Sequence, residues 1–586
     1  MKSKSIIGAC VLAASVMAVT SCQDMFEIES NRVVYQEQHQ LGSTADSVYT
    51  TLGILHNMQK IADRLIVLGE VRGDLLDVTS ITKTSLRNIA EFNFEDENEY
   101  LQVKDYYNII NNCNYALAYM DTTLTHNGDR VMQDEYVAIL GIRAWTYLQL
   151  GINHAKVPYV TEPITKVAEA EKDYPMLTIE ELAFELIPQL MPYIDYPMPD
   201  WKTLKIGSLE IKSEKLFVPI RLLIGDLYLW LGDYANAYNT YVNYLTTNKD
   251  YSFNTESGEQ IWGLMSFNGA QVETTRMAIS AIPTTAWDDY SATTGFATGR
   301  EHIAAIPMQT SSEQGTVSEL KNLFISEEGA PQLAPSNLWE ELSEKQNYYI
   351  ATKDKNNKVT VSLVPNAGDQ RYKNYTQTLD ENKGLTVATK HFNGLIYTVT
   401  NGEISVVDVL PNTHILLYRR AWAYLRAAEA ANALAAQFND AKYCVKAFNI
   451  LKDAFNFFFP NGHDEVDELR GKVLGVHARG CGDVAYDTTT YVMTPAAIYK
   501  QLDLSQDIEL TLGDSIRYVE ELIIDELALE MALEGTRFGD LVRFAKRNND
   551  PTIVAERIAT RKGSNNRDEE LYQKLMNQDN WYLPLK

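Results

Sequence analysis

The spacing of apolar residues predicts helices along most of this chain. It is clearest in residues 215–245, where leucines recur at helical spacing, at Leu222, Leu223, Leu227, Leu229 and Leu231. A short break at Gly232-Asp233-Tyr234 follows, with a glycine that is free to adopt a positive φ. A second amphipathic run then continues through Ala237, Tyr238, Tyr241 and Leu245. We therefore predict a helical hairpin, which cannot bury its own apolar face and must be flanked by further helices.

The same spacing predicts helices on both sides of this hairpin. They are expected at residues 43–64, 97–120, 134–153, 178–194, 413–437, 440–458 and 514–547. Ser43 or Thr44 should cap the first helix, and Pro188 should kink or break the fourth. Gly535 and Gly539 should interrupt the last. Residues 580–585 are apolar enough to dock on the body of the protein.

Residues 246–412 differ from the rest of the chain. Gly, Ser, Thr, Asn and Pro become frequent there and the helical period fades. Alternating apolar residues predict strands at 358–364 and, in pieces, at 385–407, where Asn393-Gly394 and Asn401-Gly402 fit tight hairpin turns. We predict a mainly α-helical domain, made of residues 43–245 and 413–586, with an irregular insertion that contains small β-hairpins. Insertions of this size are more often functional than idle.

The first residues of the chain are typical of a targeting segment. Lys2 and Lys4 precede an apolar stretch at residues 6–19 that is too short to span a bilayer comfortably. The stretch ends in Val19-Thr20-Ser21-Cys22, which resembles a bacterial lipobox. We predict a signal peptide over residues 1–21, lipidation of Cys22, and a polar tether through residue 42. An ordinary secretory signal is the alternative.

The composition argues against nucleic acid as a partner and against a framework of disulfide bonds. The formal net charge is −26, and it becomes −28 when the two lysines of the signal peptide are removed. Such an acidic chain is not expected to bind nucleic acid. Cys113, Cys444 and Cys481 remain after processing, an odd number without a CxxC pair, so we predict buried free thiols.

Sequence motifs of catalysis are missing. The chain has no P-loop, no GxSxG, no HExxH and no EF-hand spacing, and its nine histidines are scattered. A pair of carboxylates acting as a glycosidase site is not excluded by counting residues. The acidic residues 461–468 offer oxygen ligands for a structural Ca²⁺, with a plain solvated loop as the alternative. We expect no other cofactor and no enzymatic activity.

The helical hairpin resembles a tetratricopeptide repeat. The corresponding positions are Ile224-Gly225, Tyr228, Gly232, Ala237 and Tyr241. Gly225 and Ala237 should let the two helices approach closely, with Tyr228 and Tyr241 filling the space beside them. The chain departs from the motif at Arg221, Tyr244 and Lys249, where the motif has Trp, Ala and Pro.

Four further segments resemble one family. Residues 534–543 read Glu-Gly-Thr-Arg-Phe-Gly-Asp-Leu-Val-Arg, and three more segments match in order, at 142–145 with 156–160, at 426–430 and at 581–584. Together with the lipobox and the split helical hairpins, they are similar to the SusD/RagB family of outer-membrane lipoproteins of Bacteroidetes. The resemblance covers nearly the whole mature chain.

The resemblance implies a binding protein that acts beside a transporter. SusD-like proteins bind a polymer at the cell surface and sit as a lid on a SusC-like TonB-dependent transporter. The ligand is usually a glycan, and in RagB-type members a peptide. We therefore expect a glycan-binding lipoprotein, anchored in the outer membrane and facing the exterior. A peptide-binding lid, a protein-binding adaptor of the tetratricopeptide type and a hydrolase are the alternatives.

Candidate ligand contacts combine flat aromatic faces with polar groups that can bind sugar hydroxyls. In the insertion they are Trp262, Trp287, Asp288, Asp289, Tyr290 and Arg300. The alternative for Trp287 and Tyr290 is that they fix the insertion to the helical body. The resemblance adds Arg72, Asp74, Tyr106 and Asn111, in regions where family members contribute ligand contacts, although core packing is the default for Tyr106.

Three charged residues near the C-terminus are expected to have a structural role and not to bind a ligand. Arg537, Asp540 and Arg543 are spaced by three residues, so they can pair along one face of a helix. Gly535 and Gly539 suggest close packing beside them.

Overall fold

A computed structural model describes most of the chain after the predicted tether. The described residues are 41–95, 97–206, 209–247, 302–309, 312, 315–326, 329–346, 348–353, 359–364, 369–400, 403–411, 414–452, 476–477 and 491–585. The predicted signal peptide, Cys22 and the acidic residues 461–468 lie outside them. No helix among the described residues has the length and apolar character needed to cross a membrane.

The N-terminal part is built from helices joined by short two-stranded sheets. The helices are α2 (Thr44–Met58), α3 (Ala62–Glu70), α4 (Thr84–Ala90), α5 (Lys104–Tyr119), α6 (Gln133–Asn153), α7 (Val167–Ala170) and α8 (Ile179–Leu190). The sheets pair β2 (Thr125–His126) with β3 (Asp129–Arg130), β4 (Val157–Pro158) with β5 (Met176–Leu177), and β6 (Thr203–Ile206) with β7 (Leu209–Lys212). All three pairs are antiparallel.

Three predicted helices of this part have different ends in the structure. The helix expected at 43–64 is two helices, α2 and α3, and Ser43 caps the first by accepting a hydrogen bond from the backbone N–H of Asp46. The helix expected at 97–120 begins only at Lys104, after a 3₁₀ turn at Glu99–Leu101. The helix expected at 178–194 ends at Leu190, two residues after Pro188, and a 3₁₀ turn at Met191–Tyr193 follows.

The helical hairpin is confirmed as α9 (Ile220–Leu231) and α10 (Tyr234–Thr247), preceded by a 3₁₀ turn at Ser213–Leu216. Gly232 ends α9 with φ +80°, a conformation that a side chain would strain. A Cβ at Gly225 would lie 2.8 Å from the ring of Tyr241, so the two helices touch where a small residue was expected.

The insertion contains both strands and short helices. Antiparallel pairs form between β10 (Tyr348–Lys353) and β11 (Val359–Val364), β12 (Thr376–Asp380) and β13 (Leu385–Ala388), and β14 (Phe392–Thr400) and β15 (Glu403–Pro411). The helices, which the sequence pattern did not predict, are α13 (Leu320–Phe324), α14 (Asn337–Glu344) and α15 (Gln370–Tyr375).

One of the two predicted hairpin turns is wrong. The β14–β15 hairpin closes between Thr400 and Glu403, as the pair Asn401-Gly402 predicted. Asn393-Gly394 instead lies inside β14, where the pairing register shifts between Phe392 and Gly394. An Asn-Gly pair in a strand therefore marks a bulge here, since glycine accommodates the irregular backbone of either feature.

Two long-range strand pairs attach the insertion to the helical body. β1 (Leu76–Val78) pairs with β9 (Leu333–Pro335), and β8 (His302–Pro307) pairs with β16 (His414–Arg419). Residues 414–419 were expected to open a helix, but they are extended and buried along their whole length. Periodicity cannot separate a short, fully buried strand from a buried helix, and here the partner strand decides.

The C-terminal part is helical again. It contains α16 (Arg420–Phe438), α17 (Ala441–Lys452), α18 (Pro495–Gln501), α19 (Leu512–Met531), α20 (Arg537–Asn548), α21 (Thr552–Ala559), α22 (Glu569–Leu575) and a 3₁₀ turn at Gln578–Trp581. Gly535 separates α19 from α20 as predicted, whereas Gly539 lies within α20. Trp581 is buried and the backbone N–H of Leu583 donates to the carbonyl of Asn153, so the segment after α22 docks as expected.

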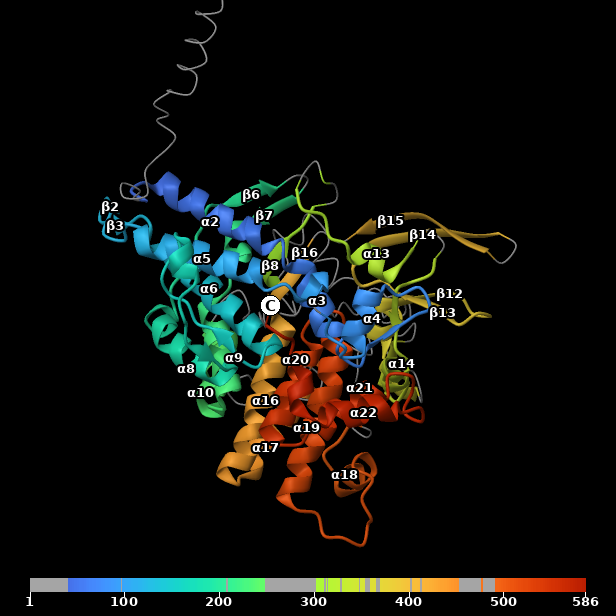
Figure 1. Cartoon of the computed structure of the whole chain (residues 1–586). Coiled ribbons are helices and arrows are strands. Elements are labelled where there is room, and N and C mark those ends of the chain that lie inside the picture. The colour runs from blue at the N-terminus through green and yellow to red at the C-terminus, as the bar shows by residue number, and fades with distance from the viewer. Residues whose placement is uncertain are drawn as a thin grey trace, which may run out of the picture.

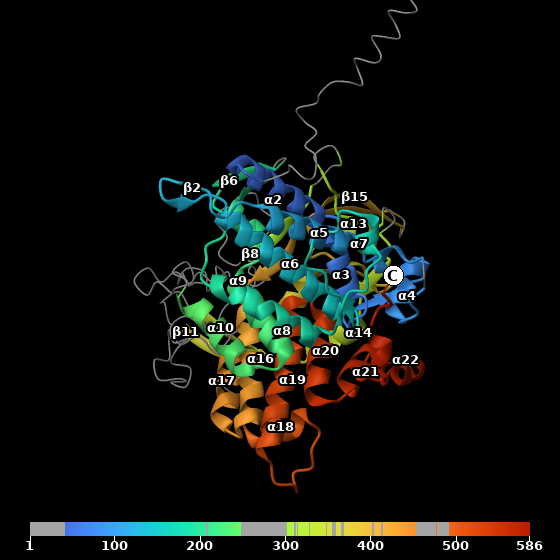
Figure 2. The ribbon, with the colours of Figure 1, turned by 60° about the vertical axis from the view of Figure 1, so that its left-hand side comes forward.

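The helices of the two parts pack together, and strands β12 to β15 of the insertion lie on one side of them. Figure 1 shows the N-terminal helices at the left and top, the C-terminal helices below, and the strands β12 to β15 at the right. In Figure 2, α8, α9 and α10 come forward in front of α16 and α20. Buried Leu, Ile, Ala and Phe side chains from both parts form the core between them.

Candidate functional site

Most candidate ligand residues of the insertion fall outside the described residues. This holds for Trp262, Trp287, Asp288, Asp289, Tyr290 and Arg300. Their assignment stays a prediction, and so does a cation at residues 461–468. Within the described ranges, no group of three or more His, Cys, Asp or Glu side chains could hold a metal ion.

Arg72 lies in the core of the protein. Its guanidinium donates to the carbonyls of Leu68 and Trp581, over 2.9 and 3.2 Å, and to the side-chain oxygen of Asn153. It also lies 4.0 Å from the centre of the Phe538 ring. The Arg72 side chain is completely buried. It therefore contacts other parts of the protein and does not reach a ligand at the surface.

Asp74 is buried as well and forms a two-pronged ion pair. Its carboxylate oxygens accept from Nε and Nη2 of Arg537, over 2.5 and 2.7 Å. Burial alone would raise the pKa of Asp74, but the Arg537 guanidinium outweighs it and holds this pKa below its ordinary value. Like Arg72, Asp74 has no surface left with which to meet a polymer.

Tyr106 and Asn111 hold the framework of α5. Tyr106 is buried, and that burial raises the pKa of its hydroxyl to about 12. Asn111, which is half-buried, both donates to the carbonyl of Ile164 and accepts from its N–H, over 3.0 and 2.7 Å. Asn114 donates to the carbonyl of Val160, so the asparagines of α5 fix the chain that follows β4.

A buried ionic cluster, which the sequence pattern did not reveal, ties the insertion to α19. Glu526, Glu530 and Glu534 are spaced by four residues, and their partners are Arg371, Lys390 and Arg419. Glu530 accepts from Arg371 over 2.8 Å and from Arg419 over 2.6 Å. The signal in the sequence is the four-residue spacing of three acids within and directly after an apolar helix: Glu526 and Glu530 lie in α19, and Glu534 follows its end.

A second buried cluster surrounds α20. Arg543 donates to both carboxylate oxygens of Glu429 over 2.7 Å and to Asp540 over 3.0 Å. Arg426 also reaches Asp540, over 2.6 Å. The predicted pair of Asp540 and Arg543 is confirmed, but Arg537 bonds Asp74 and not Asp540. The scaffold interpretation of this motif agrees with the geometry, since all its charged groups are buried and paired.

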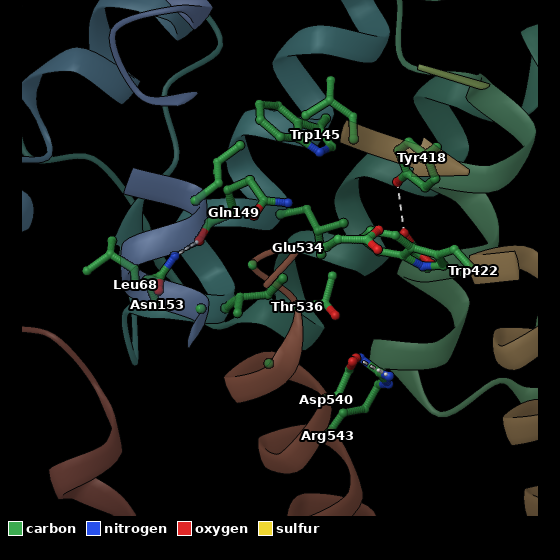
Figure 3. Close-up of a pocket in the computed structure, with 18 of the residues that line it drawn as sticks. Leu68, Trp145, Gln149, Asn153, Tyr418, Trp422, Glu534, Thr536, Asp540 and Arg543 are labelled. Carbon is green, nitrogen blue, oxygen red and sulfur yellow. Dashed lines mark hydrogen bonds and ion pairs between the residues drawn. The ribbon is translucent and has the colours of Figure 1, made fainter. Parts of the chain in front are cut away.

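A small cavity lies where α3, α6, α9, α16 and α20 meet (Figure 3). Its volume is about 60 Å³, and Trp145, Trp230 and Trp422 are among the residues that line it. Pockets that bind small molecules usually have volumes of roughly 300–1,000 Å³. The cavity is therefore too small for a sugar residue, in spite of its aromatic lining.

Two larger clefts lie along α19, with volumes of about 540 and 380 Å³. They share Leu342, Lys345, Gln501 and Asp525. The described lining of the larger cleft is polar and aliphatic, and it includes Arg517 and Arg557 beside Glu520 and Glu521, with no aromatic side chain.

The aromatic rings that line the smaller cleft already pack against other side chains of the protein. Tyr491 is stacked between Phe448 and His477, with ring centres 5.4 and 3.7 Å away. Tyr518 is buried, and its hydroxyl donates to the carbonyl of Val492. Among the described residues, neither cleft therefore offers a free ring face on which a sugar can stack.

Comparison with known proteins shows what the fold is. No family model and no curated protein matches the chain. Among solved structures, a SusD superfamily protein from Bacteroides vulgatus is 12% identical, with 91% of this chain and 92% of that one covered and a TM-score of 0.54. A putative sugar binding protein from Bacteroides vulgatus is 18% identical, covers 86% and 88%, and has a TM-score of 0.53.

A third solved structure, surface glycan-binding protein A from Bacteroides uniformis, matches over nearly its full length. It is 16% identical, covers 93% of this chain and 96% of its own, and has a TM-score of 0.52. At these identities the likeness establishes the architecture: the chain has the helical, tetratricopeptide-like fold of SusD superfamily proteins.

Proposed function

We propose that this chain, with its SusD-type fold, is a glycan-binding protein of the cell surface and not an enzyme. The observation that carries the proposal is the likeness to surface glycan-binding protein A over 93% of the chain. The buried ion pairs of segment 534–543 agree with it, because they serve packing and leave no reactive group exposed.

In finer detail, the protein captures oligosaccharide or polysaccharide and delivers it to a SusC-like TonB-dependent transporter in the outer membrane. The lipobox sequence before Cys22 supports a lipid anchor, since acyl chains give membrane affinity without a spanning helix. The transporter and the exterior orientation follow from the resemblance to the SusD/RagB family.

The ligand contacts that we propose lie in the insertion, at Trp287 and Tyr290 with Asp288 and Asp289, and at Trp262 and Arg300. What supports them is a process of elimination in the described part of the chain. Arg72 and Asp74 are engaged in the core, and the clefts along α19 have no free aromatic face.

A retention experiment tests both the ligand class and the residue. The purified protein is run through native gels that contain single polysaccharides, and peptides are screened separately by calorimetry. We expect retention by at least one glycan, and Trp287→Ala should weaken it by at least about 1 kcal/mol, a factor of about five, without changing the melting temperature. Phe438→Ala, an exposed aromatic on α16, is the matched control.

Each outcome decides one part of the proposal. Binding of peptides alone would replace the glycan by a peptide ligand, and release of sugar products from a polysaccharide panel would make the protein a hydrolase. Equal retention of Trp287→Ala and the parent would remove Trp287 from the site. For the anchor, Cys22→Ser should move the protein from the membrane fraction to the soluble fraction.

A further inference from the structure

Three polar atoms around the small cavity have no hydrogen-bond partner among the described residues. They are Nε1 of Trp422, Oγ1 of Thr536 and the carboxylate oxygen Oδ2 of Asp540. All three residues line the same cavity of about 60 Å³ (Figure 3). A buried polar atom that loses water without gaining a new partner costs about 1–3 kcal/mol, so three such atoms at one cavity call for an occupant.

The hydroxyl of Thr536 does not cap its helix and is free to bond a molecule in the cavity. It is the N-cap residue of α20, a position where threonine usually accepts a hydrogen bond from the first turn of the helix. Here its backbone is helical and its side chain makes no capping bond. Figure 3 shows the hydroxyl pointing toward the side of the cavity where Asp540 lies.

Among the described residues, only one of the two carboxylate oxygens of Asp540 has hydrogen-bond donors. Its Oδ1 accepts from Arg426 and Arg543, over 2.6 and 3.0 Å, while Oδ2 is left bare. The residue is only 1% exposed. A carboxylate has lone pairs on both oxygens, so the second oxygen needs a donor in the cavity.

The mixture of donors and acceptors defines the occupant. A bare cation would face the N–H of Trp422, and an anion would face the carboxylate of Asp540. Water donates and accepts at once, and a buried water typically makes about three hydrogen bonds. A volume of about 60 Å³ is enough for at least one water and for a small cluster.

We propose that this cavity is a hydration site, filled by an ordered cluster of water molecules that bonds Trp422 Nε1, Thr536 Oγ1 and Asp540 Oδ2. The cluster joins α16 to α20 and to the loop that precedes it. The water cluster thus satisfies three buried polar atoms of the C-terminal part, in a cavity whose opposite wall comes from α3, α6 and α9.

A crystal structure of the full mature chain at about 1.6 Å or better tests the assignment directly. We expect separate, water-sized density peaks within 2.6–3.2 Å of the three atoms. A map without a peak near any of them would overturn the proposal. Continuous density larger than water would overturn it too, since it would show a bound small molecule.

Two variants add a second readout. Thr536→Val replaces the hydroxyl by a methyl group of nearly equal size and should remove at least one peak, whereas Thr536→Ser keeps the hydroxyl and should keep every peak. Trp422→Phe should remove the peak beside the indole N–H. If the peaks are unchanged in Thr536→Val, the hydroxyl does not hold water. If a variant fails to fold, the map of the parent protein decides alone.

Discussion

The helices α19 and α20 and the hairpin β14–β15 place charged and apolar side chains in opposite ways. In α19 and α20 the acids Glu526 and Glu530 and the arginines Arg537 and Arg543 are buried. In the hairpin, several apolar side chains face the solvent: Ile396 and Val407 are 57% and 63% exposed. The hairpin projects from the body at the right of Figure 1, whereas α19 and α20 lie among the helices at its lower centre.

Buried charges mark the segments that hold the fold together, whereas exposed apolar side chains mark segments that the fold does not depend on. A buried charge is tolerated only when its partner is in place, so each such pair fixes the relative position of two segments. An exposed apolar side chain makes no such demand, because much of any protein surface is apolar. The charged motif at residues 534–543 is therefore a structural element, and variation in the hairpins is expected to be harmless to the fold.

The largest effect is expected when one partner of a buried ion pair is removed. Arg537→Met leaves the Asp74 carboxylate without its two donors, and breaking such a pair typically costs about 3–5 kcal/mol. The free energy of unfolding in urea measures it. Arg567→Met is the control, because that exposed arginine pairs with Glu556 and Glu569 at the surface and its loss should cost less than about 1 kcal/mol. Equal losses in both variants would contradict the comparison.

The next effect depends on pH. Burial raises the pKa of Glu70 from 4.5 to about 7, although its carboxylate accepts a hydrogen bond from the N–H of Gly535. The folded protein therefore binds this proton more tightly than the unfolded chain, and this group lowers stability as pH rises from about 4.5 to about 7. Glu70→Gln should be more stable than the parent by up to ~3 kcal/mol at pH 8.

The control for the Glu70 prediction compares the parent and Glu70→Gln at low pH. At pH 4 the carboxyl is protonated in both states, so parent and Glu70→Gln should melt at nearly the same temperature. Melting curves between pH 4 and pH 8 measure the difference. A gap that does not grow with pH would show that Glu70 is ionised in the fold.

A smaller effect tests the helical hairpin. Gly225→Ala puts a methyl group 2.8 Å from the Tyr241 ring, which cannot move freely because its hydroxyl donates to Asp226. Overpacking of this kind costs about 1–3 kcal/mol. Gly53→Ala in α2 meets no atom within 4 Å and should instead gain about 0.5–1 kcal/mol from helix propensity. Opposite shifts of the two melting temperatures are the expected result.

The smallest effect belongs to the projecting hairpin. Ile396→Thr and Val407→Thr keep β-branched side chains and change only exposed surface, so each should alter the free energy of unfolding by less than about 0.5 kcal/mol. Urea unfolding of the two variants checks this. A loss of several kcal/mol would mean that another surface covers the hairpin.

Local patterns predicted the parts of the fold that depend on neighbouring residues. The α9–α10 hairpin, its Gly232 turn and the contact of Gly225 with Tyr241 were all read correctly, because the two helices are adjacent in the chain. The apolar pattern of β16 fits a helix as well as a strand, and its conformation depends on β8, which lies far away in the sequence.

The candidate site was harder to predict for a related reason. The family resemblance suggested Arg72 and Asp74 as ligand residues, yet their partners Trp581 and Arg537 lie in the C-terminal part. Likewise Glu526 of α19 and Glu534, which follows this helix, pair with Arg371 and Lys390 of the insertion. A single sequence shows which residues carry charge but not which distant residue neutralises them.

The docking of Trp581 has a consequence for the order in which the protein folds. The carbonyl of Trp581 accepts from Arg72 across 509 residues of chain, and Leu583 bonds the end of α6. Ribosomes and export channels handle a chain from its N-terminus, so α3 and α6 exist long before these contacts can form. The N-terminal helices therefore complete these contacts only when a segment made hundreds of residues later has arrived, so the burial of Arg72 is a late step of folding.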